Sequence, residues 1–214
     1  MSQSSVDPSS IARLADAIAS EILSQQGGAS EKVGTVKSGG ALGDGVYTTI
    51  DEAARASRQA YLAFDQVPLS KRYRIVAAVR EVCRREGVAL AKFAHEETGL
   101  GRAEDKIAKN ELVTEKTPGP EVLEPVARSG DHGLMLTEPA SFGVIGAITP
   151  VTNPTSTIIN NAIGMISAGN TVVFNVHPSA KRVSMQTIQL INRAIVAAGG
   201  PKDVLTCIAE PTIA

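Results

Sequence analysis

Residues 141–184 read SFGVIGAITPVTNPTSTIINNAIGMISAGNTVVFNVHPSAKRVS, and this stretch decides the fold. The run from Phe142 to Ile148 is nearly all apolar and contains β-branched residues, which is typical of a strand buried on both faces. Pro150 and Pro154 follow soon after it. Because proline lacks a backbone N–H and fixes φ, these two residues predict the end of the strand and a turn.

A helix should follow this turn, with Thr155 or Ser156 as its N-cap. Its apolar face is made by residues at helical spacing: Ile158, Ile159, Ala162, Ile163 and Ile166. Gly169 ends the helix, since glycine readily takes the left-handed conformation there. A second strand is expected over Thr171–Phe174. This strand–helix–strand unit predicts parallel strands joined by a right-handed crossover.

Asn153 lies in the turn at the carboxyl end of the first strand, where an open α/β sheet places its ligand. A side-chain amide in this position has N–H groups that can donate to a developing oxyanion. Capping of the following helix by the same side chain is the alternative interpretation. Spacing alone does not separate the two.

The segments GVIGAITPVTNPT (143–155) and NNAIGMISAGNTVVF (160–174) together resemble the cofactor-binding domain of the aldehyde dehydrogenase superfamily. The common form has a tryptophan before the asparagine of the turn and a lysine then proline after the second strand. Here Val151-Thr152 precedes Asn153, and the second strand ends Asn175-Val176-His177-Pro178. Both departures are similar to the CoA-acylating branch, the propionaldehyde and acetaldehyde dehydrogenases of bacterial microcompartments. The resemblance covers residues 47–214 and implies a Rossmann-like parallel sheet preceded by helices.

This resemblance implies an enzyme that converts a short aldehyde, CoA and NAD to acyl-CoA and NADH, with NADP as a possible substitute for NAD. In that branch a cysteine thiolate attacks the aldehyde, and CoA takes the acyl group from the resulting thioester. The nucleophilic cysteine belongs to a second domain, and no residue of this chain matches its motif. We therefore expect the chain to be the amino-terminal, partial cofactor-binding domain of the enzyme, inactive by itself.

Matching positions imply the roles of individual residues. Asn153 would form the oxyanion hole. Residues along the nicotinamide end of the cofactor would be Thr149, Pro150, Val151 and Thr152, and residues near the adenosine ribose would be Asn175, His177 and Pro178. Asn175 replaces the usual lysine, so the sequence does not decide whether the cofactor is NAD or NADP. His177 either contacts the cofactor or caps the helix expected to begin at Ser179.

Composition excludes several classes of protein. The chain has 214 residues, is 43% hydrophobic and carries a net charge of −1, which suits one sizeable domain and gives no reason to expect a nucleic-acid partner. No apolar run reaches the ~20 residues that a membrane span needs. The two cysteines do not make a disulfide framework, so we expect a cytoplasmic protein. His95-Glu96 lacks a second His four residues on, and no metal site is expected.

Residues 1–26 are expected to form a separate amphipathic helix. Its apolar stripe consists of Ile11, Leu14, Ala15, Ile18 and Ile22, and residues 27–46 read as a Gly/Ser-rich flexible linker. Packing on its own domain is one interpretation of this helix. The other is docking on a partner, which the linker favours because a short helix is marginal in isolation. The resemblance implies that the partner is a shell protein and that the enzyme is in a microcompartment lumen.

The folded body is expected to begin near Tyr47. Four helices precede the central unit, at residues 50–65, from Ser70 to an interruption at Gly87, at 88–98 and at 104–117. Residues 121–139 should form a hairpin, which the resemblance links to contacts within a homo-oligomer. Cys83 lies among apolar helix residues and Cys207 lies inside a strand at 204–209, so both are expected to be inert core residues.

A non-catalytic function is the alternative, namely a nucleotide-binding fragment or a cargo adaptor that acts through the amino-terminal helix. The missing cysteine domain favours it for this chain, and the motifs favour the enzyme. An unrelated Rossmann oxidoreductase is opposed by the sequence, because no G-x-G-x-x-G follows an expected strand.

Overall fold

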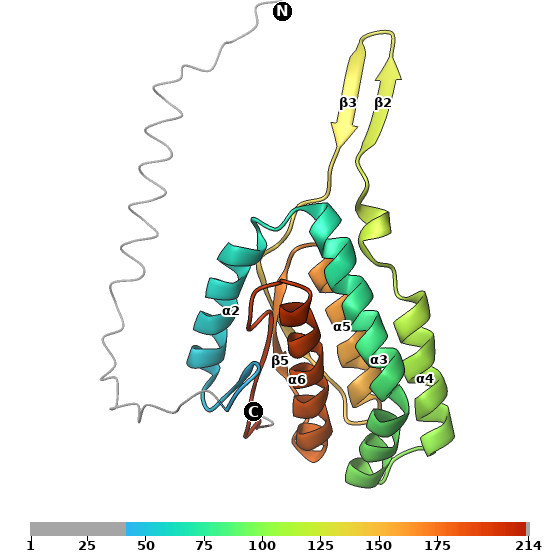
Figure 1. Ribbon diagram of the computed structural model, residues 1–214, viewed down its shortest axis with the longest axis vertical. Helices are drawn as coiled ribbons and strands as arrows, with labels where there is room; N and C mark the ends of the chain where they lie inside the picture. The colour runs from blue at the N-terminus through green and yellow to red at the C-terminus, as the bar shows by residue number, and fades with distance from the viewer. Residues whose placement is uncertain (1–41, 213–214) are drawn as a thin grey trace, which may run out of the picture. The chain divides into compact units, whose positions relative to one another are not determined.

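The computed structural model describes residues 42–212 (Figure 1). Its central feature is a parallel sheet of four strands in the order β1-β6-β5-β4. The strands are β1 (Val46–Tyr47), β4 (Val144–Ile148), β5 (Thr171–Asn175) and β6 (Leu205–Ile208). The predicted α/β class and the parallel pairing of the central unit are confirmed. The predicted amino-terminal helix lies outside the described residues.

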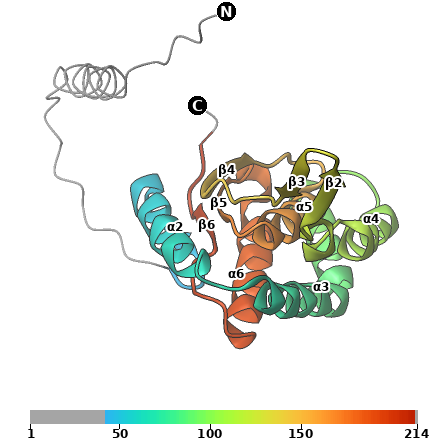
Figure 2. The same cartoon turned by 90° about the horizontal axis from the view of Figure 1, so that it is seen from above.

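Helices cover the two faces of this sheet in layers (Figure 2). One face carries α2 (Ile50–Phe64), and the other carries α5 (Pro154–Ser167) and α6 (Lys181–Ala197). Outside α5 and α6 lie α3 (Leu69–Thr98) and α4 (Ala103–Lys116). Two short 3₁₀ turns, η1 (Pro120–Leu123) and η2 (Pro178–Ala180), follow α4 and β5 respectively. No helix within residues 42–212 has the length and apolar character to cross a membrane.

The main core lies between the sheet and the α5–α6 layer. Its fully buried side chains include Phe174, Ile159, Ile163, Ile188 and Leu205. On the other face, α2 meets the sheet through small and polar groups. The buried Ser57 hydroxyl donates to Thr171 Oγ1 at 2.9 Å, and Thr171 Oγ1 donates to the Ser57 carbonyl at 3.0 Å. These bonds satisfy polar groups that burial would otherwise destabilise.

Helices α5 and α6 end in the same way. Gly169 takes φ +81°, and its N–H donates to the Ile166 carbonyl while the Asn170 N–H donates to the Met165 carbonyl. Gly199 takes φ +82° after α6 and makes the equivalent pair of bonds. Both are Schellman motifs, in which glycine avoids the steric cost of the left-handed conformation. The predicted stop at Gly169 is confirmed.

The burial predicted for the first central strand is wrong. We expected an apolar strand over Phe142–Ile148 with both faces covered. The observed β4 begins at Val144, and Phe142 and Ile148 are 93% and 83% exposed. The physical reason is its position: β4 is the edge strand of the described sheet, and α2 packs chiefly on β5 and β6.

The predicted interruption at Gly87 is also wrong, because α3 continues through it as one helix of 30 residues. Tertiary contacts outweigh the poor helix propensity of glycine here. Gly87 is buried under α4, and its carbonyl accepts from Asn110 Nδ2 at 3.0 Å. We expected Ser70 to cap this helix, but the N-cap position is occupied by Pro68, two residues earlier.

Residues 126–137 form the predicted hairpin, from β2 (Val126–Gly130) and β3 (Gly133–Thr137) around Asp131-His132. Figure 1 shows this hairpin projecting from the rest of the described chain. Every residue of both strands is exposed, including Leu134, Met135 and Leu136. A hairpin with two uncovered apolar strands has surface available for another chain. Its predicted role in a homo-oligomer stays a prediction.

The last residues of the predicted linker belong to the sheet. Val46 is 2% exposed and pairs with Cys207, and the Gly45 carbonyl accepts from the Cys207 N–H at 2.9 Å. Gly45 has φ +94°, and a Cβ on it would overlap the Leu205 carbonyl oxygen and the Asn192 amide. Gly43 has nearly the same φ, +95°, but open space around it.

These two glycines give a matched test of packing at β1. Gly43→Ala should cost about 1–2 kcal/mol, the strain of a left-handed alanine. Gly45→Ala should cost about 3–5 kcal/mol, because overpacking against α6 and β6 adds to that strain. Urea unfolding midpoints of the two variants measure the difference. Equal losses would show that β1 is not packed as described.

Candidate functional site

The predicted site residues meet at the carboxyl end of β4 and β5. Ile148 pairs with Asn175, and the Thr149 N–H donates to the Asn175 carbonyl at 3.1 Å. The turn at residues 149–153 therefore lies beside the turn at 175–178. This edge is where a parallel sheet binds its ligand. Two segments that are more than 20 residues apart in the sequence are thus brought together, as the strand–helix–strand interpretation predicted.

Asn153 occupies the N-cap position of α5, but its side chain makes no capping hydrogen bond. Its Oδ1 accepts from Lys109 Nζ at 3.0 Å, and its Nδ2 approaches Thr152 Oγ1 at 3.4 Å. The capping interpretation of Asn153 is therefore wrong. Pro154 is the first residue of α5, where its missing N–H costs nothing.

The predicted capping by Thr155 or Ser156 is wrong as well. Both residues are buried inside the first turn of α5. Thr155 Oγ1 donates to Asn110 Oδ1 at 2.8 Å, so its hydroxyl joins α5 to α4 rather than to its own helix end.

Helix α4 holds the whole turn through three neighbouring side chains. Lys106 Nζ donates to the Thr152 carbonyl at 2.7 Å, Lys109 binds Asn153, and Asn110 binds Thr155. The sequence analysis missed these three residues. Their spacing at i, i+3 and i+4 is the available signal, because it places them on one face of a helix.

The two lysines give the turn a positive potential. Lys106 is 6% exposed, and its burial, together with the Lys109 charge, lowers the pKa of its ammonium. Within residues 42–212 neither ammonium forms an ion pair with a carboxylate. A positive potential at a turn with an amide donor favours negative charge that develops on a ligand oxygen.

Thr149 has a buried hydroxyl without a partner. The residue is 2% exposed, and its Oγ1 makes no hydrogen bond within the described part of the chain. An unpaired buried hydroxyl costs about 1–3 kcal/mol. A polar ligand atom at this edge would supply the missing partner. Of its neighbours, Pro150 and Thr152 are exposed, and Val151 packs against the small core cluster around Leu90.

The residues after β5 have mixed roles. Asn175 is exposed at the end of the strand. His177 Nδ1 accepts from the Ser179 N–H at 3.1 Å, so this ring caps η2, one of the two roles predicted for it. The capping bond makes Nδ1 an acceptor, which leaves Nε2 as the position of the proton in the neutral ring. Pro178 is the first residue of η2.

The amino terminus of α6 is already occupied by a carboxylate of the protein. Glu97, near the end of α3, accepts from the backbone N–H groups of Arg182 at 2.9 Å and Val183 at 2.7 Å. This bond neutralises the positive end of the helix dipole. The first turn of α6 is therefore not free to bind an anionic ligand.

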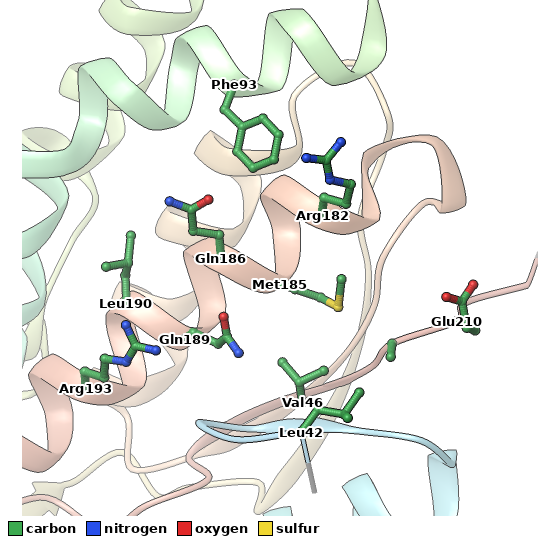
Figure 3. Close-up of a pocket in the computed structure, with 11 residues that line it drawn as sticks. Leu42, Val46, Phe93, Arg182, Met185, Gln186, Gln189, Leu190, Arg193 and Glu210 are labelled. Atoms are coloured by element: carbon green, nitrogen blue, oxygen red, sulfur yellow. The ribbon is translucent and has the colours of Figure 1, made fainter.

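A cleft of about 620 Å³ lies elsewhere, between α6, the end of α3 and the start of β1 (Figure 3). Figure 3 shows Arg182 beside the Phe93 ring, with its guanidinium carbon 5.2 Å from the ring centre. Arg193 at the other end of the cleft pairs with Asp44 at 2.6 Å. The cleft shares no residue with the predicted site.

Neither cysteine of the chain is placed to act as a nucleophile. Cys83 and Cys207 are 3% and 0% exposed, and burial raises the pKa of each thiol to about 12. Arg80 and Arg84 oppose the shift at Cys83, but desolvation is the larger effect. The prediction that both cysteines lie in the core is confirmed, and their inertness stays a prediction. Residues 42–212 also contain no cluster of His, Cys, Asp or Glu suited to a metal ion.

Thiol labelling checks this directly. With a pKa of about 12, roughly one thiol in ten thousand is ionised at pH 8, and burial also blocks access. Iodoacetamide at pH 8 should therefore leave Cys83 and Cys207 unmodified in the folded protein and modify both in urea. Peptide mass spectrometry reads each site separately. Modification of either cysteine without denaturant would contradict the assignment.

Comparison with known proteins identifies the family to which this chain is similar. The model of the aldehyde dehydrogenase family matches residues 31–213. An acetylating acetaldehyde dehydrogenase of Bilophila wadsworthia is 44% identical over 204 residues, which are 95% of this chain and 42% of that protein. The predicted family resemblance is confirmed.

Solved structures agree. A propionaldehyde dehydrogenase from the fucose utilisation bacterial microcompartment of Clostridium phytofermentans matches with a TM-score of 0.76 and 46% identity, over 79% of this chain and 39% of that one. The propionaldehyde dehydrogenase of Rhodopseudomonas palustris, solved with bound CoA and an acylated cysteine, matches with a TM-score of 0.77 and 44% identity, over 80% and 39%. The chain thus spans about two-fifths of the length of the relatives it matches.

Proposed function

This chain belongs to the aldehyde dehydrogenase family, and we propose that it is the amino-terminal part of a CoA-acylating aldehyde dehydrogenase. The observation that carries the proposal is the uncapped amide of Asn153. It lies at the ligand-binding edge of the sheet, with its oxygen turned to Lys109 and its Nδ2 left with one long contact. A donor in this state suits an oxyanion hole.

The proposed reaction begins on the aldehyde carbon. A cysteine thiolate from outside this chain forms a C–S bond there, and the carbonyl oxygen becomes an alkoxide. Asn153 Nδ2 donates to this alkoxide and stabilises it. A bound nicotinamide cofactor would supply the hydride acceptor, so that the C–S adduct would become a thioester. The CoA thiolate would then displace the enzyme sulfur, and the sum would be aldehyde, CoA and NAD⁺ to acyl-CoA, NADH and a proton.

The residues present fit a nicotinamide cofactor. Thr149 has a buried hydroxyl that needs a polar partner, and it lies beside Asn175 at the same edge. Together with Pro150, Val151 and Thr152, Thr149 would lie along the nicotinamide end. Asn175, His177 and Pro178 would lie near the ribose of the adenosine. Asn175 is neutral and exposed, so it can donate to ribose hydroxyls without excluding NADP.

The names of the relatives support the class of substrate. They act on acetaldehyde and propionaldehyde, and the Rhodopseudomonas palustris protein binds CoA. We propose a short aldehyde and CoA as the substrates of the protein that contains this chain. The thiol chemistry lies outside residues 1–214, since Cys83 and Cys207 are buried and protonated.

Replacement of Asn153 tests the oxyanion hole. In the protein that contains this chain, Asn153→Ala should lower kcat roughly a hundredfold to a thousandfold, the usual loss for one such donor. The assay follows NADH and acyl-CoA with propanal or acetaldehyde, NAD and CoA. Asn161→Ala on the same helix is the control and should leave kcat unchanged. A folded wild-type protein that makes no acyl-CoA from any short aldehyde would contradict the proposed function.

We also propose that residues 1–26 address the enzyme to the lumen of a bacterial microcompartment. The apolar stripe Ile11, Leu14, Ile18 and Ile22 would dock on a shell protein. One solved relative comes from such a compartment. The exposed hairpin β2–β3 would serve contacts within a homo-oligomer.

A matched pair of substitutions tests the stripe. Ile18→Glu places a charge on the apolar face and should remove most of the enzyme from purified compartments, with kcat unchanged. Ser20→Glu adds the same charge on the polar face and should leave encapsulation unchanged. The fraction of activity that sediments with intact shells measures both. Equal encapsulation of the two variants would refute docking through this stripe.

A further inference from the structure

We propose that Lys109 is a positioning residue that orients the Asn153 amide for catalysis, with Lys106 holding the backbone next to it. The inference rests on the proposed function, because it gives Lys109 a task in that same oxyanion hole. It is carried by two bonds from consecutive turns of α4 to consecutive residues of the turn: Lys106 Nζ to the Thr152 carbonyl at 2.7 Å and Lys109 Nζ to Asn153 Oδ1 at 3.0 Å.

The Lys109 contact decides which end of the amide faces the ligand. A primary amide can turn over by rotation about its last side-chain bond, which exchanges the oxygen for the NH₂ group at little steric cost. An ammonium only donates, so the group that faces Lys109 must be Oδ1. The NH₂ group then points away from α4. In the opposite orientation an oxygen would face the developing alkoxide and repel it.

The charge of Lys109 also strengthens the donor. A hydrogen bond from an ammonium to an amide oxygen draws electron density from the amide nitrogen, and bonds in such a chain polarise one another. Lys109 is exposed, so solvent screens part of this effect. Orientation is accordingly the larger contribution we assign to it.

Lys106 and the rest of α4 make the support rigid. The Lys106 side chain is 6% exposed and has little freedom to leave the Thr152 carbonyl. Asn110, one residue after Lys109, joins Thr155 of α5 to Gly87 of α3. The Lys109 backbone is therefore fixed relative to the first turn of α5, and its side chain reaches Asn153 from a fixed base.

Steady-state kinetics of the full-length protein test the proposal. Lys109→Met keeps the side-chain length and removes the charge. It should lower kcat roughly tenfold to a hundredfold, less than loss of the donor itself, with the KM values for NAD and CoA changed less than about twofold. Lys109→Arg keeps a donor and should restore most of kcat. Lys116→Met, an exposed lysine near the end of α4, is the matched control and should have no effect.

A double-mutant cycle separates orientation of Asn153 from general structural support. If Lys109 acts through Asn153, Lys109→Met should change kcat less than about twofold in the Asn153→Ala background. Losses that multiply would overturn the proposal, since Lys109 would then act independently of the amide. A raised KM with unchanged kcat would overturn it too, because that result indicates a contact with cofactor or substrate.

Neutron crystal structures of Lys109→Met and Lys109→Arg, which distinguish the amide oxygen from the nitrogen, give a readout that does not depend on activity. We expect the Asn153 amide to turn over, or to occupy both orientations, in Lys109→Met and to keep the wild-type orientation in Lys109→Arg. A single wild-type orientation of the amide in Lys109→Met overturns the positioning role even if the wild-type protein proves inactive with every short aldehyde. That inactivity would refute the proposed function separately.

Discussion

The parallel register of β4 against β5 is the constraint on which the site depends. The turn that follows α5 connects this helix to β5, and it also fixes the register of β4 against β5. Asn170, directly after the Schellman glycine, accepts at Oδ1 from the N–H groups of Phe142 at 2.6 Å and Gly143 at 3.0 Å. A slip of one residue would turn every side chain of β4 to the opposite face. It would also separate Thr149 from Asn175.

Polar contacts from outside the sheet then fix what the register has placed. Lys106, Lys109 and Asn110 reach the turn from α4, which packs on α3 and α5. The Asn110–Thr155 pair is buried, so removal of either side chain would leave the other unpaired at a cost of about 1–3 kcal/mol. The geometry of the turn therefore depends on helices α3, α4 and α5 and on strands β4 and β5 together.

The sequence predicted those features of the fold that depend on residues close together in the chain. Helix and strand periods, the prolines of the turn and the glycine after α5 gave the strand–helix–strand unit, and with it the meeting of Asn153 and Asn175. The sequence did not predict features that depend on contacts between residues far apart in the chain. Gly87 stays helical because Asn110 bonds to its carbonyl, and Asn153 does not cap α5 because Lys109, 44 residues earlier, holds its oxygen. No local pattern contains those pairs.

The prediction that both faces of β4 are buried was wrong for the same reason, because burial depends on parts of the fold distant in the sequence. Its apolar residues have the pattern of a strand with neighbours on both sides and covered faces, whereas the described sheet leaves one edge and part of one face open. Such an edge is a template for pairing, and exposed Phe142 and Ile148 add apolar surface beside it. In the proposed enzyme, whose relatives are more than twice as long as this chain, further strands and the thiol-bearing part would cover that edge. The turn bearing Asn153 would then face the incoming cysteine across the boundary, with its donor already oriented from behind by α4.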